Sequence, residues 1–190
     1  MSFKPFVDVD LETLTESLNI VAANSLSASG RVTSQAGTPP ATTGADIVLA
    51  SITIPAGAIG TLADQLENFE IFAQGKFGAT ANNKRLKIIV NPTAPVVGSA
   101  VVGGTTILDT GAVNTNGGGF VLDASLVRTG VNTQLGFNYG SIVGTTHQGT
   151  SAPVALAIAD GAAFSIVVTG NATTATTDIL LNIFEVDAMG

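Results

Sequence analysis

The sequence predicts an all-β protein, a jelly-roll β-sandwich of about eight strands preceded by an N-terminal arm. Short runs alternate apolar and polar residues, which is the pattern of strands that bury one face. Glycine, proline and asparagine interrupt these runs every ~10 to 20 residues, as turns between strands do. No stretch keeps the spacing of a long helix. Spacing alone leaves the strand order open.

Composition divides the chain into three segments. Residues 1–23 are expected to form the arm, residues 24–45 a linker or loop, and residues 46–190 the jelly-roll domain. The linker is rich in Ser, Ala, Gly, Thr and Pro and lacks apolar periodicity, which is typical of loops. With one sandwich of this length, the chain can bury a sizeable core.

The arm supports two interpretations. Residues 7–12 alternate between apolar and acidic, as in an edge strand, whereas the leucines that follow have helical spacing. Asp8, Asp10 and Glu12 might suggest a calcium site, but a calcium loop needs further oxygen ligands and usually a turn glycine, whereas alternating acids on a strand are normally solvated. A solvated acidic face is therefore the favoured interpretation.

The strands of the sandwich follow in order, each bounded by turn residues. They are expected at residues 47–54, 66–77, 84–91, 105–109, 119–129, 133–143, 164–169 and 179–184. Pro55 ends the first of them because proline has no donor for a β-ladder. In the third, Leu86, Ile88 and Val90 should face inward and Lys87 outward.

The last two strands are expected to form a C-terminal hairpin. In the final strand, Ile179, Leu181 and Ile183 alternate with a second apolar set that contains Leu180 and Phe184. Strict alternation places these two sets on opposite faces, one against the core and one against a neighbouring sheet or subunit.

A basic cluster, Lys84, Arg85 and Lys87, marks the beginning of one strand. Such a cluster more often protects a sheet edge or meets acids of a neighbouring subunit than holds a ligand. We therefore expect no ligand site there.

The chain is poor in charge, and this predicts self-association. Charged residues make up 11% of the sequence, and residues 129–159 contain none. A solvated surface of this kind would aggregate, so we expect much of it at an interface. The candidate interface residues are Leu135, Phe137, Tyr139, Ile142, Leu180 and Phe184.

Composition also argues against several classes of partner. The net charge is −7, which disfavours nucleic acid because phosphate binding needs clustered Lys and Arg. The apolar runs are much shorter than the ~18 residues of a spanning helix, so we expect no membrane partner. The first residues lack the apolar stretch of a secretory signal, and we expect no export. Cys is absent, which excludes thiolate chemistry.

No arrangement of residues predicts an enzyme, a metal site or a cofactor. His147 is the only histidine, and no carboxylate lies near it in sequence, so a polar loop residue is the favoured interpretation. Gly117–Gly119 lacks the Lys-Ser or Lys-Thr pair and the helix of a phosphate loop. Paired carboxylates of a glycosidase remain an alternative, but the chain lacks tryptophan and has one tyrosine. The acids in question are Glu67, Glu70, Asp109 and Asp123.

Four segments, taken together, resemble the small jelly-roll virion proteins of tailed bacteriophages. They are SITIPAGAIGT, NNKRLKIIVN, SLVRTGVNTQ and DILLNIFEVDAM, in this order from about residue 47 to the C-terminus. These proteins serve as capsid decoration (cement) proteins or as heads of fibres and tail appendages.

The resemblance implies a non-enzymatic structural protein on the outer surface of the capsid, assembled in the host cytoplasm and commonly trimeric. Its partners would be further copies of itself and the major capsid protein. A fibre or receptor-binding head is the alternative. We expect the arm to dock on the shell, with its acids facing basic patches: Asp8, Asp10, Glu12 and Glu16.

Overall fold

The computed structural model describes residues 30–33, 44–59, 68–143, 146–148, 152–172 and 178–189. The predicted arm, with Asp8, Asp10, Glu12 and Glu16, lies outside the described residues, and so does most of the predicted linker. All regular structure in the described ranges is strand, which confirms the prediction of an all-β fold. No helix in these ranges is long and apolar enough to cross a membrane.

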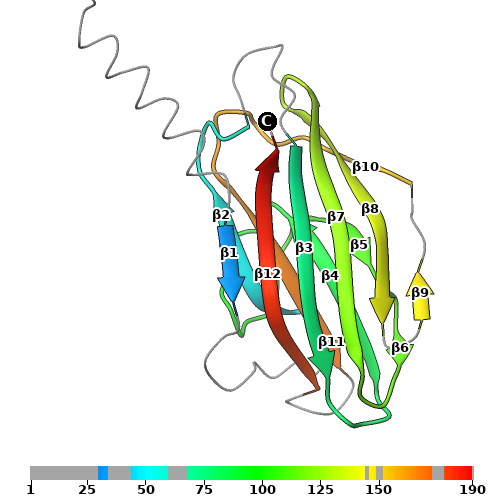
Figure 1. Ribbon diagram of the computed structural model, residues 1–190. Helices are drawn as coiled ribbons and strands as arrows, with labels where there is room; N and C mark the ends of the chain where they lie inside the picture. The colour runs from blue at the N-terminus through cyan, green and yellow to red at the C-terminus, as the bar shows by residue number, and fades with distance from the viewer. Residues whose placement is uncertain are drawn as a thin grey trace, which may run out of the picture.

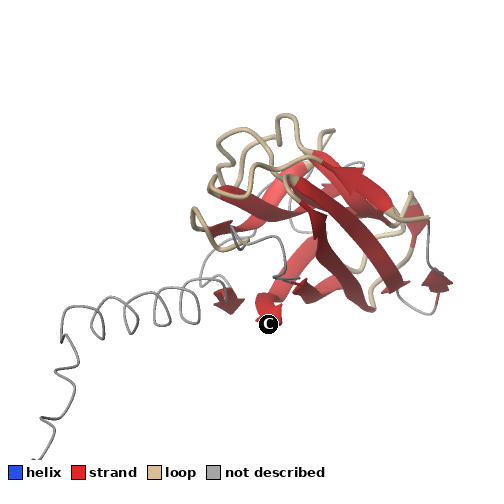
Figure 2. Ribbon diagram, turned by 90° about the horizontal axis from the view of Figure 1, so that it is seen from above, coloured by secondary structure: helices blue, strands red, loops and turns tan. Residues whose placement is uncertain are grey.

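The twelve described strands form two antiparallel sheets that pack face to face (Figures 1 and 2). Sheet A, which faces the viewer in Figure 1, contains in spatial order β1 (Gly30–Thr33), β12 (Ile179–Met189), β3 (Asn68–Phe77), β7 (Gly119–Gly130), β8 (Thr133–Val143) and β10 (Val154–Leu156), with β9 (Thr146–Gln148) paired to β8. Sheet B contains β2 (Ile47–Ile54), β11 (Phe164–Ala172), β4 (Asn83–Val90) and β5 (Thr105–Asp109), with β6 (Val113–Asn114) paired to β4.

The strand order is that of a jelly roll. Strands β1 to β4 alternate between sheets A and B, β5 stays in sheet B, and β7 returns to sheet A. The chain then comes back through both sheets, with β11 between β2 and β4 and β12 between β1 and β3. These eight strands make the double Greek key. The short strand β6 and the run β8 to β10, which widens sheet A, are additions to it.

The core lies between the sheets and is built by alternation along each strand. On β3, Phe69, Ile71, Ala73, Gly75 and Phe77 are buried, while the residues that alternate with them point outward. The ring of Phe69 meets Phe164 of β11 edge-on across the sandwich, with centroids 6.2 Å apart. Such an edge-to-face pair adds to the free energy gained by burial alone.

The predicted C-terminal hairpin is wrong. The strand β11 pairs with β2 and β4 in sheet B, whereas β12 pairs with β3 and β1 in sheet A. Consecutive strands of a jelly roll often belong to opposite sheets, and a local pattern of strand, turn and strand cannot distinguish this from a hairpin.

Strand β12 also corrects the predicted face of Phe184. The pairing of β12 with β3 shifts between Leu181 and Ile183, so Asn182 is an extra residue in the ladder. Such a β-bulge reverses the alternation beyond it. Phe184 therefore joins Ile179 and Leu181 in the core, fully buried, and is no candidate for a subunit interface.

Other strand boundaries agree closely with the sequence. Strands β2, β5 and β8 have the predicted bounds, and Pro55 follows β2 directly. Strand β1 lies inside residues 24–45, which the sequence analysis assigned to a linker; its pairing with β12 makes it the edge of sheet A. Its four residues carry too little pattern to be recognised.

The β4–β5 loop, residues 91–104, folds back over the outer face of sheet B. Its backbone bonds to β2, with Val48 N–H donating to Ser99 O and Gly98 N–H to Val48 O, both at 2.9 Å. The loop covers a small second apolar cluster made by Val48, Ile89 and Val167. Its tip, in contrast, exposes Val96 and Val102 by 61% and 63%.

Candidate interaction surface

Apolar side chains line the outer face of sheet A along β7 and β8. Val127 lies opposite Leu135, and Ser125 lies opposite Phe137. Leu135, Phe137 and Val127 are half-buried, although nothing in the described chain lies above this face. We call Val127, Leu135, Phe137 and Tyr139 the β8 strip.

Tyr139 is the most exposed member of the β8 strip, and the fold holds it in place. The pairing of β7 with β8 shifts between Asp123 and Ala124, so β8 bulges at Tyr139. Gly140 follows at φ 138°, and its N–H donates to Asn138 Oδ1 at 2.9 Å. The phenol is 54% exposed, yet its hydroxyl is hydrogen-bonded to Ser125 Oγ at 2.8 Å.

Carboxylates lie beside the β8 strip on the same face. Glu70 lies opposite Ser125 on β7 and opposite Asp187 on β12, and Asp123 lies opposite Phe72. We call Glu70, Asp123 and Asp187 the acidic patch. None of the described cations pairs with these three carboxylates. Burial alone raises the pKa of Asp123, without any compensating cation.

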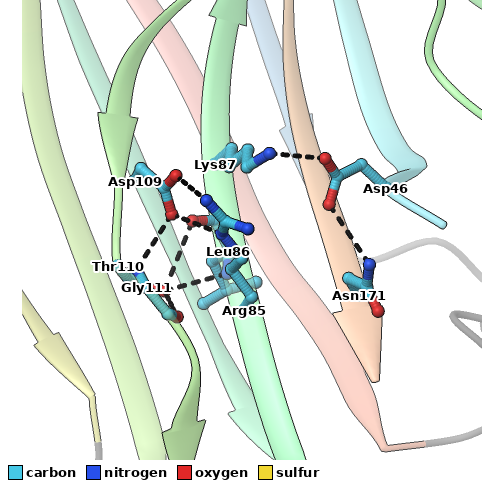
Figure 3. A network of polar contacts seen from close by, with 8 residues as sticks. All are labelled: Asp46, Arg85, Leu86, Lys87, Asp109, Thr110, Gly111 and Asn171. Carbon is cyan, nitrogen blue, oxygen red and sulfur yellow. Dashed lines mark hydrogen bonds and ion pairs between the residues drawn. The ribbon is translucent and has the colours of Figure 1, made fainter. Parts of the chain in front are cut away.

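The basic cluster does not lie at a sheet edge, the role that the sequence suggested for it. Its strand, β4, is central in sheet B, and its side chains are satisfied within the chain. Lys87 Nζ pairs with Asp46 Oδ2 at 2.6 Å, and Arg85 pairs with Asp109 through both carboxylate oxygens (Figure 3). Lys84 is 1% exposed, and its Nζ donates to the carbonyl oxygens of Thr80, Asn82 and Thr115: 2.6, 3.2 and 2.9 Å.

These contacts set the protonation of Asp109. Burial would raise the pKa of its carboxyl, but the hydrogen bonds from Arg85 and from the Gly111 N–H outweigh burial and lower it. The same ion pair raises the pKa of Arg85. Asp46 is also held by Asn171, whose Nδ2 lies 3.4 Å from Asp46 Oδ1 (Figure 3). The acids of sheet B are thus neutralised inside the molecule.

The two charges that bound the uncharged stretch, Arg128 and Asp160, pair with each other. Arg128 NH2 donates to Asp160 Oδ2 at 2.8 Å, with side chains 1% and 9% exposed. Asp160 Oδ1 accepts from the Asn132 N–H, and Gln134 bonds the backbone of Ile158 in both directions at 2.8 Å. The hydrogen bond from Arg128 lowers the pKa of Asp160. The loop after β10 is thereby fixed to β8.

The remaining candidates are spread over the fold. Asp109 belongs to sheet B, away from Glu70 and Asp123 on the outer face of sheet A, while Glu67 lies outside the described residues. His147, expected in a loop, is on β9 opposite Ile142. No group of three or more metal-ligating side chains was found in the described ranges.

Among the predicted interface residues, the structure groups three. Leu135, Phe137 and Tyr139 share the outer face of β8, whereas Leu180 is at the far end of β12 and Phe184 is in the core. For Ile142 only the backbone is described. Val127, Ser125 and Asp187 also belong to this face and were not predicted, although alternation along β7 and β12 indicates an outward face for them.

Comparisons with known proteins add little to this picture. No protein-family model and no curated protein matches the chain. Among solved structures, the CBM2 module of the evolved Dit protein of Lactobacillus casei BL23 phage J-1 matches with a TM-score of 0.32 and 10% identity. The match covers 72% of this chain and 66% of that one, less than two thirds of its length. A match of this size supports no inference about function, which rests on the residues themselves.

Proposed function

We propose that this protein is a non-enzymatic virion structural protein of a tailed bacteriophage, a capsid decoration (cement) protein that binds the major capsid protein and stabilises the head. The observation that supports this most is the outer face of sheet A, where the β8 strip and the acidic patch lie side by side and no other described strand or loop covers them. The resemblance of four segments to phage jelly-roll proteins points the same way.

The mechanism is burial of surface across junctions of the shell. Each Å² of apolar surface removed from water contributes about 25 cal/mol, and a decoration protein adds this contribution to contacts that the shell already has. We propose a homotrimer on the outer surface of the capsid, since several linked sites raise avidity without new contacts. In this proposal the arm at residues 1–23 also contacts the shell.

The number of copies in the purified particle tests the proposal. A decoration protein is present in a fixed ratio to the major capsid protein, and particles that lack it lose infectivity faster on heating or osmotic shock. Quantitative mass spectrometry and a heat-inactivation series measure both. A copy number that matches a tail component, or particles of unchanged resistance, would contradict the decoration role.

A receptor-binding head of a fibre is the second candidate, and Tyr139 favours it. An exposed, hydrogen-bonded aromatic ring next to Asp123 and Glu70 can stack on a sugar whose hydroxyls meet the carboxylates. This candidate predicts binding to host polysaccharide that Tyr139→Ala abolishes. Polysaccharide cleavage that is lost on Glu70→Gln or Asp123→Asn would instead show an enzyme.

A further inference from the structure

Negative charge is distributed unevenly over the described domain. Three acids that lie on sheet B or in loops are neutralised by cations of the same chain, in the pairs Asp46 with Lys87, Asp109 with Arg85 and Asp160 with Arg128. No cation whose side chain the structure describes pairs with the acidic patch. On the outer face of β3, Lys76 lies at the far end of the strand, opposite Gly119. One face of the sandwich therefore carries the excess charge.

The acidic patch and the β8 strip form one continuous surface. Ser125, which holds the Tyr139 hydroxyl, is the cross-strand neighbour of both Phe137 and Glu70. Asp123 is the cross-strand neighbour of Gly140, next to Tyr139. Directly opposed residues of adjacent strands have Cβ atoms about 5 Å apart, so a single partner can contact both groups.

A second copy of this chain is poorly suited to cover this surface. Its net charge is also −7. Among the cations whose side chains the structure describes, Arg85, Lys87 and Arg128 are already paired and Lys84 is buried, which leaves Lys76 alone against three carboxylates. Covering the acidic patch with another copy would bring like charges together, which costs free energy. Charge complementarity thus favours a different protein.

We propose that the outer face of sheet A, the acidic patch together with the β8 strip, docks on a basic protein surface that places Arg or Lys side chains opposite the carboxylates and an apolar group against Tyr139. The inference rests on the proposed function and deepens it, since the partner surface is then on the capsid shell. It also assigns Leu135, Phe137 and Tyr139 to the shell contact rather than to self-association.

Two further observations agree with this partner. Partial desolvation raises the pKa of the Asp123 carboxyl although the residue is exposed, and a partner's Arg opposite it would lower that pKa again. Arg can in addition stack on the ring of Tyr139, because guanidinium groups bind aromatic faces. The hydrogen bond to Ser125 fixes the hydroxyl before docking, so less side-chain entropy is lost.

Binding to purified shells that lack the protein tests the inference, with the dissociation constant measured at several salt concentrations. The neutralised variant carries Glu70→Gln, Asp123→Asn and Asp187→Asn. Its matched control carries Val96→Lys, Ser99→Lys and Val102→Lys, which changes net charge equally on exposed positions of the β4–β5 loop. Tyr139→Ala is compared with Val131→Ala, a change at another exposed apolar residue.

The neutralised variant should bind shells about tenfold more weakly and with a smaller salt dependence, while the charge control binds normally. Tyr139→Ala should also weaken binding, and Val131→Ala should not. Circular dichroism checks that each variant is folded.

Three results would overturn the inference about the docking surface, and a fourth would refute the decoration role itself. If wild type binds and the neutralised variant binds equally well, this face is not the docking surface. If Tyr139→Ala instead dissolves a homo-oligomer in light scattering, a second copy occupies the strip. If the variants lose binding to host polysaccharide and not to shells, the partner is a glycan. Wild type that fails to bind shells at all would refute the proposed function itself.

Discussion

At the scale of single residues, the buried pair of Arg128 and Asp160 is the most sensitive point of the described structure. Both side chains are almost inaccessible, and each holds a segment: Arg128 belongs to β7 and Asp160 to the loop that follows β10. The pair neutralises the two charges that bound the uncharged stretch, so neither ion is buried without its counter-ion.

We predict that Asp160→Asn lowers the free energy of unfolding by about 3 to 5 kcal/mol, because it leaves the Arg128 charge buried without its anion. The double change Arg128→Met with Asp160→Asn should cost clearly less than the single one. Urea denaturation of the single and double variants measures this. Equal losses in both would show that the ion pair is not what the site depends on.

The same pair predicts how stability varies with pH. The pKa of Asp160 in the fold is lower than its ordinary value of 3.8, so its contribution is fully present above 3.8 and is lost as pH falls through the lowered pKa. The difference in unfolding free energy between wild type and Asp160→Asn should therefore shrink on acidification below that value. A constant difference from neutral pH to strong acid would contradict the assignment.

At the scale of elements, the β-bulges decide which side chains face the core. The bulge at Asn182 turns Phe184 inward, whereas Tyr139 keeps the outward face that alternation from Leu135 and Phe137 predicts, and the bulge there changes only the alternation beyond it. Periodicity predicts where β12 and β8 lie, since both alternate over most of their length. It cannot predict a bulge, because the extra residue depends on the partner strand and not on local preference.

We expect Phe184→Ala to destabilise the protein by about 3 to 5 kcal/mol, as for a fully buried phenylalanine. Tyr139→Ala, on the exposed side of β8, should cost about 1 kcal/mol, since a single neutral hydrogen bond and little burial are lost. Thermal unfolding of the two variants compares them. Similar small costs for both would mean that Phe184 is not in the core.

Sheets A and B approach each other closely where β8 packs against β5, because Gly136 has no side chain there. A Cβ on Gly136 would lie 2.3 Å from Ile107 Cγ2 of β5, whereas a Cβ on Gly161 would meet nothing within 4 Å. Gly136→Ala should therefore cost about 1 to 3 kcal/mol through overpacking, with Gly161→Ala as the matched control near zero. If Gly136→Ala were as stable as wild type, the two sheets could move apart at this position without loss of unfolding free energy.

At the scale of the whole molecule, the distribution of charge indicates which kind of partner the protein binds, more than any single residue does. Composition predicted a protein that associates with others, and the positions of most strands followed from alternation and turn residues. The jelly-roll order could not be read from spacing, because β11 and β12 are adjacent in sequence and lie in different sheets. The acidic patch could not be foreseen either, since β3, β7 and β12 bring its members together from distant segments.

The apolar part of the candidate surface could be predicted from the sequence, whereas its acidic part could not. Leu135, Phe137 and Tyr139 were selected from the uncharged stretch because three apolar or aromatic residues alternate there. Their neighbours Glu70, Asp123 and Asp187 change the expected partner from a second copy to a basic surface. Only the sheet register shows this, because it places carboxylates next to the strip.

The most direct test is a reconstruction of the assembled phage particle by electron cryomicroscopy, at a resolution that places the sandwich. The account predicts this protein on the capsid, with the outer face of sheet A against the shell, Tyr139 covered, and basic side chains of the shell opposite Glu70, Asp123 and Asp187. A particle in which that face points to solvent, or in which the protein is absent from the head, would contradict it.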